Sequence, residues 1–456
     1  MQAFVDIVVK ISNWIWGIPM LIILLGGGII LTINLGFFQF KHFGFIMKQT
    51  FGKIFEKKQE GEGTVTAFQA ATAALASTIG ASNIVGVPVA IAFGGPGAVF
   101  WMWMTALIGS ASKFSEIVLG IKYREKNELG EYVGGPMYYL KKGLHSPFLG
   151  GLFAFCLMVE LIPSVATQTV SVVQTAGTIG IPSWATGLVV AIIVGIVVYG
   201  GIKRIAQVTE KMVPFMALLY LIGATIIVIL NIENLPKVIA LIFKDAFTPA
   251  AAAGGFAGAG VAQAMRWGIA RGSYSNEAGM GTAPMAHCTA ITDHPVRQAM
   301  WGVFEVVVDT LIVCTMTALV VLTTGLYETV PTSEAASIPA LAFQGLFGKA
   351  LGGGIVTISL LLFVLSTIIV VVFYGEKQAE YLFGTKFSKV MRFVYLLAIF
   401  LGAYGGIEFL YNFLDILLAT IIIPNMAGLI LMRKEVRDLK DDFFNNPKYY
   451  PGAKAK

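Results

Sequence analysis

Two short segments with the same pattern, Ser-Asn-x-x-Gly, carry the residues of this chain best suited to binding chemistry. They lie at 82–86 and 275–279, inside long apolar stretches that are dense in Gly, Ser and Asn where a simple membrane anchor would be rich in Leu. Gly and Ser allow a helix to open inside a bilayer, and the freed carbonyl and amide groups then need partners. An ion and a small zwitterion can supply those partners. The pattern therefore favours a solute site at two interrupted helices.

The alternative is that these small residues only let helices pack closely. Packing explains Ala70–Ala76 well, but it gives no reason for Arg271 and Glu277, because a charge at membrane depth is costly unless it is paired or wetted. These two residues either pair with each other or line a water-filled path. A structural ion pair and a contact with the substrate both remain open. Gln168 is also unusual at this depth, and either faces a pocket or bonds a neighbouring helix.

The elements that must position these residues are membrane helices. Of the 456 residues, 56% are hydrophobic and 13% are charged, whereas soluble domains carry about 25% charged residues. A water-soluble enzyme is therefore excluded. At roughly 20 residues per crossing, the sequence predicts an all-α integral membrane protein with about 11 transmembrane helices. The apolar runs are 14–35, 68–93, 97–121, 147–177, 183–200, 210–231, 257–288, 298–325, 352–374, 390–404 and 407–432.

The two motif copies lie in the first helix of two successive five-helix blocks, 67–231 and 257–432. Because five is odd, the second block enters the membrane from the opposite side, which predicts a 5+5 inverted repeat. Interrupted helices at matching places in two such halves point to the binding site of a transporter. We expect one extra N-terminal helix and a basic cytoplasmic loop in 1–66, an extracellular loop in 232–256, and a solvated cytoplasmic tail in 433–456.

Basic residues fix the expected orientation. Of the 32 Lys and Arg residues, 25 fall in the loops of one face and four in those of the other, and the basic face of a membrane protein is cytoplasmic. We therefore expect a multi-pass protein of the cell (plasma) membrane, with its N-terminus outside and its C-terminus in the cytoplasm. The net charge of +6 follows from this asymmetry and requires no nucleic acid. The three cysteines, at 156, 288 and 314, have neither disulfide nor metal spacing.

Longer motifs carry a resemblance to a known family. They are Arg271–Pro284 followed by Ala286-His287, and the stretches 80–87, 94–103, 134–139 and 374–384. They resemble the alanine or glycine:cation symporter family (sodium:alanine symporters), within the amino acid-polyamine-organocation superfamily. The chain departs slightly from the family pattern, with Ala81 where Thr is common and Met280 for Leu. The resemblance implies the leucine-transporter fold and sodium-coupled uptake of alanine or glycine by alternating access, with no resident cofactor.

The resemblance also implies substrate contacts. The backbone amides of residues 79–81 would take the carboxylate, at the partly positive end of a half-helix. Carbonyls near Thr78 and in Gly272–Tyr274, with the Asn276 side chain, would hold the ammonium group. Asn83 would support the opened segment. The predicted substrate-binding residues are Thr78, Ile79, Gly80, Ala81, Asn83, Gln168, Gly272, Ser273, Tyr274 and Asn276.

One polar pair, Ser366-Thr367, interrupts the apolar ninth run. The fold resembled here places a hydroxyl pair at this point of a sodium site, facing carbonyls of the first broken helix. By resemblance these are the carbonyls of Ala76 and Ile79, three residues apart and so on one helix face. Alternatively, the hydroxyls bond the carbonyls of their own helix.

Two rival interpretations stay open. A proton-coupled amino-acid symporter would need a buried Glu or Lys at the position of the hydroxyl pair. An intramembrane enzyme would show paired catalytic groups, and a channel would repeat a short filter around a symmetric oligomer. Neither pattern is found in the sequence, so we expect a transporter whose partners are a small amino acid, sodium and the bilayer.

Overall fold

The chain is helical through almost all of the part that the structure describes. That structure is a computed structural model and describes residues 8–453, apart from 9, 13, 55, 57–59, 178–180, 249–259 and 405–407. The end of the predicted extracellular loop therefore lies outside the described residues. Regular strands occur in this part only as one antiparallel hairpin, in which β1 (Glu125–Lys126) pairs with β2 (Tyr132–Val133).

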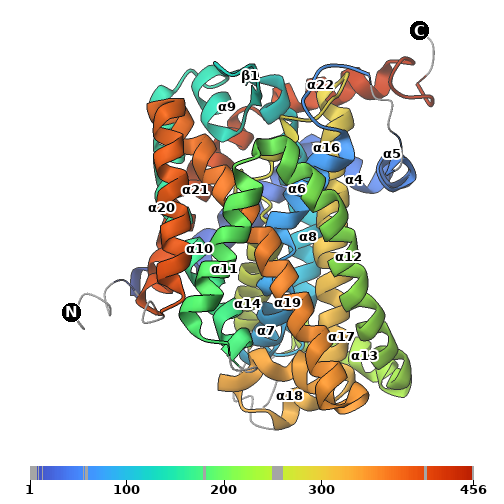
Figure 1. Cartoon of the computed structure of the whole chain (residues 1–456). Coiled ribbons are helices and arrows are strands. Elements are labelled where there is room, and N and C mark those ends of the chain that lie inside the picture. Colours follow the sequence, from blue (N-terminus) through green and yellow to red (C-terminus); the bar gives the residue numbers. More distant parts are fainter. Residues whose placement is uncertain are drawn as a thin grey trace.

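The long helices lie side by side in an elongated bundle (Figure 1). The first half contains α2 (Ile18–Leu21), η1 (Ile22–Gly26), α3 (Gly27–Asn34), α4 (Phe38–Lys41), α5 (Phe43–Gln49), η2 (Phe51–Lys53), α6 (Ala67–Thr78), η3 (Ser82–Gly86), α7 (Val87–Gly94), α8 (Gly97–Lys122), α9 (Pro136–Lys142), α10 (Pro147–Gly177), α11 (Ser183–Val198) and α12 (Gly201–Leu230). The second half contains η4 (Ile232–Asn234), α13 (Leu235–Phe247), α14 (Val261–Asn276), α15 (Pro284–His287), α16 (Pro295–Val306), η5 (Val307–Cys314), α17 (Thr315–Thr323), α18 (Leu326–Thr329), η6 (Thr332–Ser337), α19 (Ile338–Phe383), α20 (Thr385–Gly402), α21 (Glu408–Leu431) and α22 (Arg433–Asn445).

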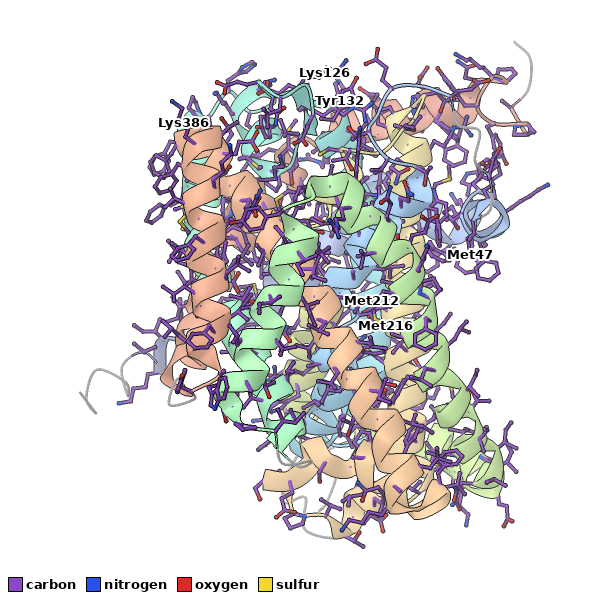
Figure 2. The ribbon with its side chains drawn as sticks, in the orientation of Figure 1. Met47, Lys126, Tyr132, Met212, Met216 and Lys386 are labelled. Carbon is purple, nitrogen blue, oxygen red and sulfur yellow. The ribbon has the colours of Figure 1, made fainter. Side chains whose placement is uncertain are left out.

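The two ends of the bundle differ in charge as the sequence predicts. The elements α5, α9, β1 and α22 gather at one end of the bundle and α13 and α18 at the other (Figure 1). Lys126 and Lys386 both lie at the first end (Figure 2). This is the end that carries the basic loops predicted to face the cytoplasm.

Each predicted apolar run falls on one helix or on a few consecutive helices. In the described part of the chain, five helices are long and apolar enough to cross a membrane, or seven if each of two bent pairs counts as one span. Two further runs fall on shorter apolar helices, Ile18–Asn34 and Ser183–Val198. The helical membrane architecture is confirmed, whereas the count of eleven crossings stays a prediction.

Two helices lie where the sequence predicted a loop and a solvated tail. In the loop, α13 packs beside α8, and its Asp245 carboxylate accepts a hydrogen bond from the Gly97 amide (2.8 Å). In the tail, Val436 and Phe443 of α22 are fully buried. These two apolar residues lie seven positions apart and so share one helix face, which packs on the basic end of the bundle, whereas the other residues of α22 are partly or fully exposed. The tail is therefore docked along one face and solvated on the others.

Close packing of α14 against α8 sets the position of the second motif. A Cβ built on Gly268 would lie 2.3 Å from the Ala98 carbonyl oxygen, and one on Gly272 would lie 3.2 Å from Met102 Cα. Larger residues at these two positions would push the helices apart. These two glycines therefore serve helix packing, as the alternative interpretation of the small residues proposed.

Candidate functional site

The first predicted interruption is present. α6 ends at Thr78, and Ile79 then takes an extended backbone conformation (φ −77°, ψ 91°). The chain bends by 49° between α6 and the segment formed by η3 and α7. Gly80 lets the bend lie directly against α19, because a Cβ built there would be 2.8 Å from Thr367 Oγ1.

The hydrogen bonds of the first break leave two carbonyls without their helical donors. The Gly80 amide donates to Asn83 Oδ1 (2.9 Å), and the Asn83 amide donates to the Gly80 carbonyl (3.2 Å). In a continuous helix these two amides would bond the carbonyls of Ala76 and Ile79. Ala76 and Ile79 are the residues whose carbonyls the family resemblance assigns to sodium.

The second interruption is also present, and it begins inside the second motif copy at 275–279, as predicted. α14 runs to Asn276, and the Ser273 carbonyl accepts from the Glu277 amide (2.9 Å), so this carbonyl is engaged within the helix and not free for an ammonium group as the resemblance implied. The helix opens one residue later, where the Ala278 amide donates to Asn276 Oδ1 (3.0 Å) and not to the Tyr274 carbonyl. Glu277 takes the left-handed conformation (φ 55°), and Gly279 and Gly281 follow with φ of 93° and 79°. The chain opens where its glycines have positive φ, not where they pack against α8.

Polar residues of two neighbouring helices hold the second break open. Lys113 Nζ, on α8, donates to the Asn276 carbonyl (2.9 Å). One turn further along α8, the Glu116 carboxylate accepts from the Gly281 amide (3.0 Å) and from Asn425 Nδ2 of α21 (2.7 Å). Peptide groups released from helical bonding thus gain charged partners, as an opened helix in a membrane requires.

The two motif copies meet in space through their polar residues. Asn83 Nδ2, in the first copy, donates to Ser275 Oγ of the second copy (3.0 Å) and to the Asp309 carboxylate of η5 (2.6 Å). Ser275 Oγ also donates to Asp309 (2.8 Å), and Asn276 Nδ2 donates to Thr310 Oγ1 (3.2 Å). Asn83 is fully buried. Both motif asparagines therefore join the breaks to η5.

A small cavity lies where the two breaks face α10 and α19. Its volume is about 50 Å³. Five predicted residues line it, namely Thr78, Gly80, Gln168, Tyr274 and Thr367. The other lining residues are Ser77, Ser82, Leu157, Glu160, Leu161, Ser164, Glu277, Met280, Thr282, Val371, Tyr374, Leu418 and Ile421. We call it the central cavity.

The remaining predicted residues do not line this cavity, and of these Ala81 lines the outer cavity described next. The others are Ile79, Asn83, Gly272, Ser273 and Asn276 of the predicted substrate site and Ala76, Ile79 and Ser366 of the predicted sodium site. Two of the three amides expected to bind the carboxylate already donate within the protein, since the Ile79 amide bonds the Leu75 carbonyl (2.8 Å) and the Gly80 amide bonds Asn83.

A larger cavity of about 440 Å³ borders η3 and the start of α7, and α7 lies in the half of the bundle away from the basic end (Figure 1). It is lined by Ala81, Ser82, Val85, Gly86, Val89, Thr167, Gln168, Ser171, Arg271, Tyr274 and Leu414, and it shares Ser82, Gln168 and Tyr274 with the central cavity. We call it the outer cavity. Arg271 lies over the Trp267 ring (5.4 Å to its centroid). No ion pair joins Arg271 to Glu277 in the described part of the chain, and Glu277 bonds Ser77 and Thr282 instead.

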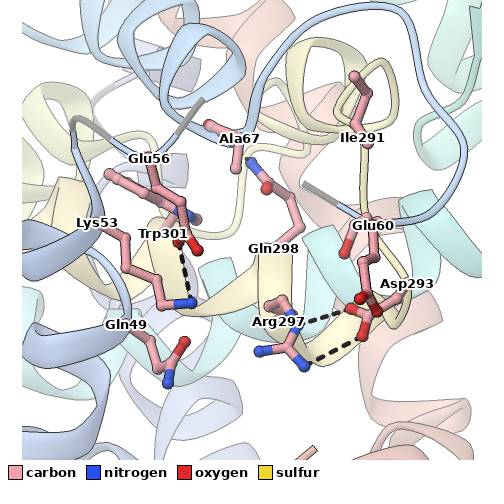
Figure 3. Close-up of a pocket in the computed structure, with 11 residues that line it drawn as sticks. Gln49, Lys53, Glu56, Glu60, Ala67, Ile291, Asp293, Arg297, Gln298 and Trp301 are labelled. Atoms are coloured by element: carbon pink, nitrogen blue, oxygen red, sulfur yellow. Dashed lines mark hydrogen bonds and ion pairs between the residues drawn. The ribbon is translucent and has the colours of Figure 1, made fainter. Parts of the chain in front are cut away.

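A third cavity, of about 250 Å³, lies at the basic end, beside the start of α6 (Figure 3). Its walls hold the ion pairs Lys53–Glu56 (3.0 Å) and Arg297–Asp293 (2.6 Å). Gln298 Nε2 closes its inner side by donating to the Ala67 carbonyl (3.1 Å). This cavity of the basic end shares no described residue with the central cavity.

Comparison with known proteins decides the family. A sequence model described as the sodium:alanine symporter family matches residues 1–454. The chain belongs to this family. The family and its structural neighbours are transporters, which confirms that the protein is a transporter and not an enzyme.

Individual relatives and a solved structure agree with this assignment. The chain is 52% identical to the uncharacterized transporter YflA of Bacillus subtilis, over 96% of this chain and 93% of that protein. It is 41% identical to the sodium/alanine symporter AgcS of Methanococcus maripaludis, over 94% of this chain and 95% of that protein. The fold is similar to the crystal structure of MhsT in complex with L-phenylalanine (TM-score 0.63, 13% identity, 81% of this chain and 89% of that chain). A fold like that of the leucine transporter is thereby confirmed.

In this family member the hydroxyl pair of α19 meets two different environments. Thr367 Oγ1 and Ser366 Oγ both donate to the Phe363 carbonyl (2.9 and 2.8 Å), so the predicted alternative of bonding within the helix is observed. Each hydroxyl oxygen keeps lone pairs that can still bind a cation. Thr367 lines the central cavity, whereas Ser366 faces Met216 Sδ (3.5 Å), which lies midway along the bundle on α12 (Figure 2).

Sequence reasoning missed several polar residues of the central cavity. They are Ser77, Ser82, Glu160, Ser164, Thr282 and Tyr374, whereas Glu277, which the sequence singled out, does line the cavity. Spacing could have found two of them, because Glu160, Ser164 and Gln168 lie at intervals of four and so share one face of α10. Thr282 carries no such signal, since it reaches the cavity only through the irregular backbone of the second break.

Proposed function

We propose that this protein is a secondary active transporter that couples sodium entry to the uptake of alanine, glycine or both by alternating access. The observation that carries the proposal is the loss of helical donors at Ala76 and Ile79, beside the Thr367 hydroxyl. Carbonyl and hydroxyl oxygens are the hard ligands that an alkali cation prefers. The family assignment and the similarity to AgcS, which is named a sodium/alanine symporter, support the same function.

The proposed membrane arrangement has eleven crossings and a 5+5 inverted repeat. The blocks 67–231 and 257–432 follow an N-terminal helix and loop in 1–66, are separated by an extracellular loop in 232–256 and precede a cytoplasmic tail in 433–456. Two observations support it: each block begins with a broken helix, and the two motif copies contact each other. The position of the basic loops at one end of the bundle supports an outside N-terminus and a cytoplasmic C-terminus in the plasma membrane.

The small central cavity supports a small substrate. In our proposal the amino-acid carboxylate binds near Ala81 and Ser82, where the outer half of the first broken helix begins and amides point into the cavity region. Gln168 and Tyr274, which line both cavities, lie on the route from the outer cavity. Leu157, Leu161 and the other apolar lining residues leave little room for a long side chain.

Sodium is favoured over a proton as the coupled ion. The proton-coupled alternative needs a Glu or Lys beside Ser366 and Thr367. In the described part of the chain, the hydrogen bonds of this pair go to the Phe363 carbonyl and Met216 Sδ, neither of which exchanges a proton. Glu160 and Glu277 line the same cavity as Thr367, but no hydrogen bond joins them to either hydroxyl in that part of the chain. The predicted sodium ligands are therefore the carbonyls of Ala76 and Ile79 with the two hydroxyls.

Uptake of labelled alanine into proteoliposomes tests the proposal. Sodium and proton gradients are imposed separately, in otherwise identical buffers. We expect saturable uptake driven by an inward sodium gradient and little uptake without sodium. Uptake driven by protons in sodium-free buffer would refute sodium coupling, and unsaturable flux would indicate a channel.

A further inference from the structure

The central cavity is acidic at one end. Glu160 of α10 and Glu277 of the second break both line it, and no Lys or Arg is among its lining residues in the described part of the chain. Two carboxylates that share a small buried space without a cation raise each other's energy. The cavity therefore suits a positively charged group.

Of the two carboxylates, Glu160 has fewer hydrogen-bond partners within the described part of the protein. Its side chain is only 3% exposed, and within the described chain it has no hydrogen bond or ion pair. Glu160 lines the cavity, so a solute bound there can supply the partner that burial of a carboxylate demands. Ser164 and Gln168, one and two turns along α10, line the cavity beside it.

Glu277 is held in place by the protein itself. Its carboxylate accepts hydrogen bonds from Ser77 Oγ (3.3 Å) and from the Thr282 hydroxyl. The left-handed backbone of Glu277 ends α14 and turns the side chain toward the first break. The acidic end is thus built from three elements, α6, α10 and the second break.

We propose that Glu160 and Glu277 together bind the ammonium group of the transported amino acid. The proposal rests on the function proposed above, in which the carboxylate lies near Ala81 and Ser82. Ser82, Glu160 and Glu277 all line the same small cavity, so an amino acid whose carboxylate lies by Ser82 keeps its ammonium group within reach of the two carboxylates. Ala76 and Ile79, whose carbonyls are the proposed sodium ligands, are not among the residues that line this cavity. The two carboxylates take the role first given to the Gly272–Tyr274 segment, in which the Ser273 carbonyl is bonded to the Glu277 amide.

Binding of L-alanine to the purified full-length protein at saturating sodium tests the proposal. Glu160→Gln keeps the size of the side chain but removes its charge. We expect the Kd for alanine to rise roughly 10- to 100-fold, because a hydrogen bond to a charged group is lost. The Tm without substrate should stay the same or rise, since an unpaired buried charge has been removed, while the increase in Tm on adding alanine should shrink. Glu334→Gln, at an exposed residue of η6, is the matched control and should behave as wild type.

A second measurement uses the unaltered protein. L-Lactate has a hydroxyl where alanine has its ammonium, so it should compete with labelled alanine roughly 100-fold more weakly. Equal competition by lactate, or an unchanged alanine Kd in Glu160→Gln, overturns the proposal. An unchanged alanine Kd with a reduced number of bound sodium ions also overturns it, by making Glu160 part of a second sodium site. If wild-type protein fails to bind or transport alanine at all, the proposed function is refuted instead.

Discussion

Replacing Gly80 with alanine places a methyl group directly into the proposed sodium site. Gly80 does not have a positive φ, so the change adds volume without backbone strain. The new Cβ would lie 2.8 Å from Thr367 Oγ1, about 0.6 Å closer than an ordinary contact of 3.4 Å. Thr367 has little freedom to yield, because it is β-branched and its hydroxyl is bonded to the Phe363 carbonyl.

The expected cost follows from this overlap. Inserting a methyl group into a well-packed site costs about 1–3 kcal/mol. If α6 and α19 separate to relieve it, the carbonyls of Ala76 and Ile79 move away from the Thr367 hydroxyl and sodium loses ligands. The sodium concentration for half-maximal alanine uptake should then rise roughly 5- to 150-fold. Uptake into proteoliposomes at increasing sodium measures this, with Tm as the measure of folding.

A double-mutant cycle separates crowding from loss of a ligand. Thr367→Ala removes the atom that Gly80→Ala meets, so the double variant should regain most of the Tm that Gly80→Ala loses. Its sodium affinity should stay low, because the hydroxyl is absent. If Gly80→Ala has the sodium dependence of wild type, or if the two changes lower Tm additively, the two residues do not form one site and the reasoning is wrong.

Three further predictions concern the site and its orientation. Asn83→Ala should lower the free energy of unfolding by about 2–3 kcal/mol, because it removes the bonds that join the two breaks; a Tm equal to wild type would contradict this. Thr367→Val should raise the sodium concentration for half-maximal uptake about tenfold, whereas Ser366→Ala should have a smaller effect because its hydroxyl faces α12, and the reverse order would exchange their roles. Val85→Cys should react with a membrane-impermeant thiol reagent only from outside and Lys53→Cys, whose native side chain is 38% exposed, only from the cytoplasm, against a low background from three buried native cysteines; labelling from the opposite sides would invert the topology.

The sequence predicted both breaks, but it did not predict which residues of the second motif region open. The first break follows Thr78, where Ile79 and Gly80 were expected to open. The second break falls in the motif at 275–279, but carbonyls from Gly272 onward were also expected to be free, because sequence alone does not distinguish a glycine that packs against a helix from one that turns the chain. Gly272 packs against α8, and the positive φ values belong to Gly279 and Gly281. That distinction depends on which helix lies alongside, which is a property of the whole fold.

Sequence alone could anticipate only some of the site residues, because it does not show which neighbouring helix a polar side chain will contact. Gln168 was expected at a cavity because an uncharged polar residue at membrane depth needs a reason, and it does line one. Asn83 and Asn276 gave the same signal, yet they connect the breaks to η5. A polar residue near a broken helix can thus serve the bound solute or the freed backbone. Only the three-dimensional arrangement decides between these two roles. Glu277 has both, because its backbone forms part of the second break and its side chain lines the central cavity.

In the proposed alternating-access cycle, the two sides of the central cavity play different parts. The outer cavity shares three lining residues with the central cavity, whereas a buried polar chain lies toward the basic end, which we propose faces the cytoplasm. It runs from Lys113 to Glu305 (3.4 Å), then to His287 (2.5 Å), then to Gln298 (2.9 Å), which bonds the Ala67 carbonyl at the start of α6. Because Lys113 also bonds the second break, we expect a rearrangement at the solute site to reach this chain through charged contacts. We then expect opening toward the basic end to separate Gln298 from Ala67, with entering water replacing the bond that α6 gives up.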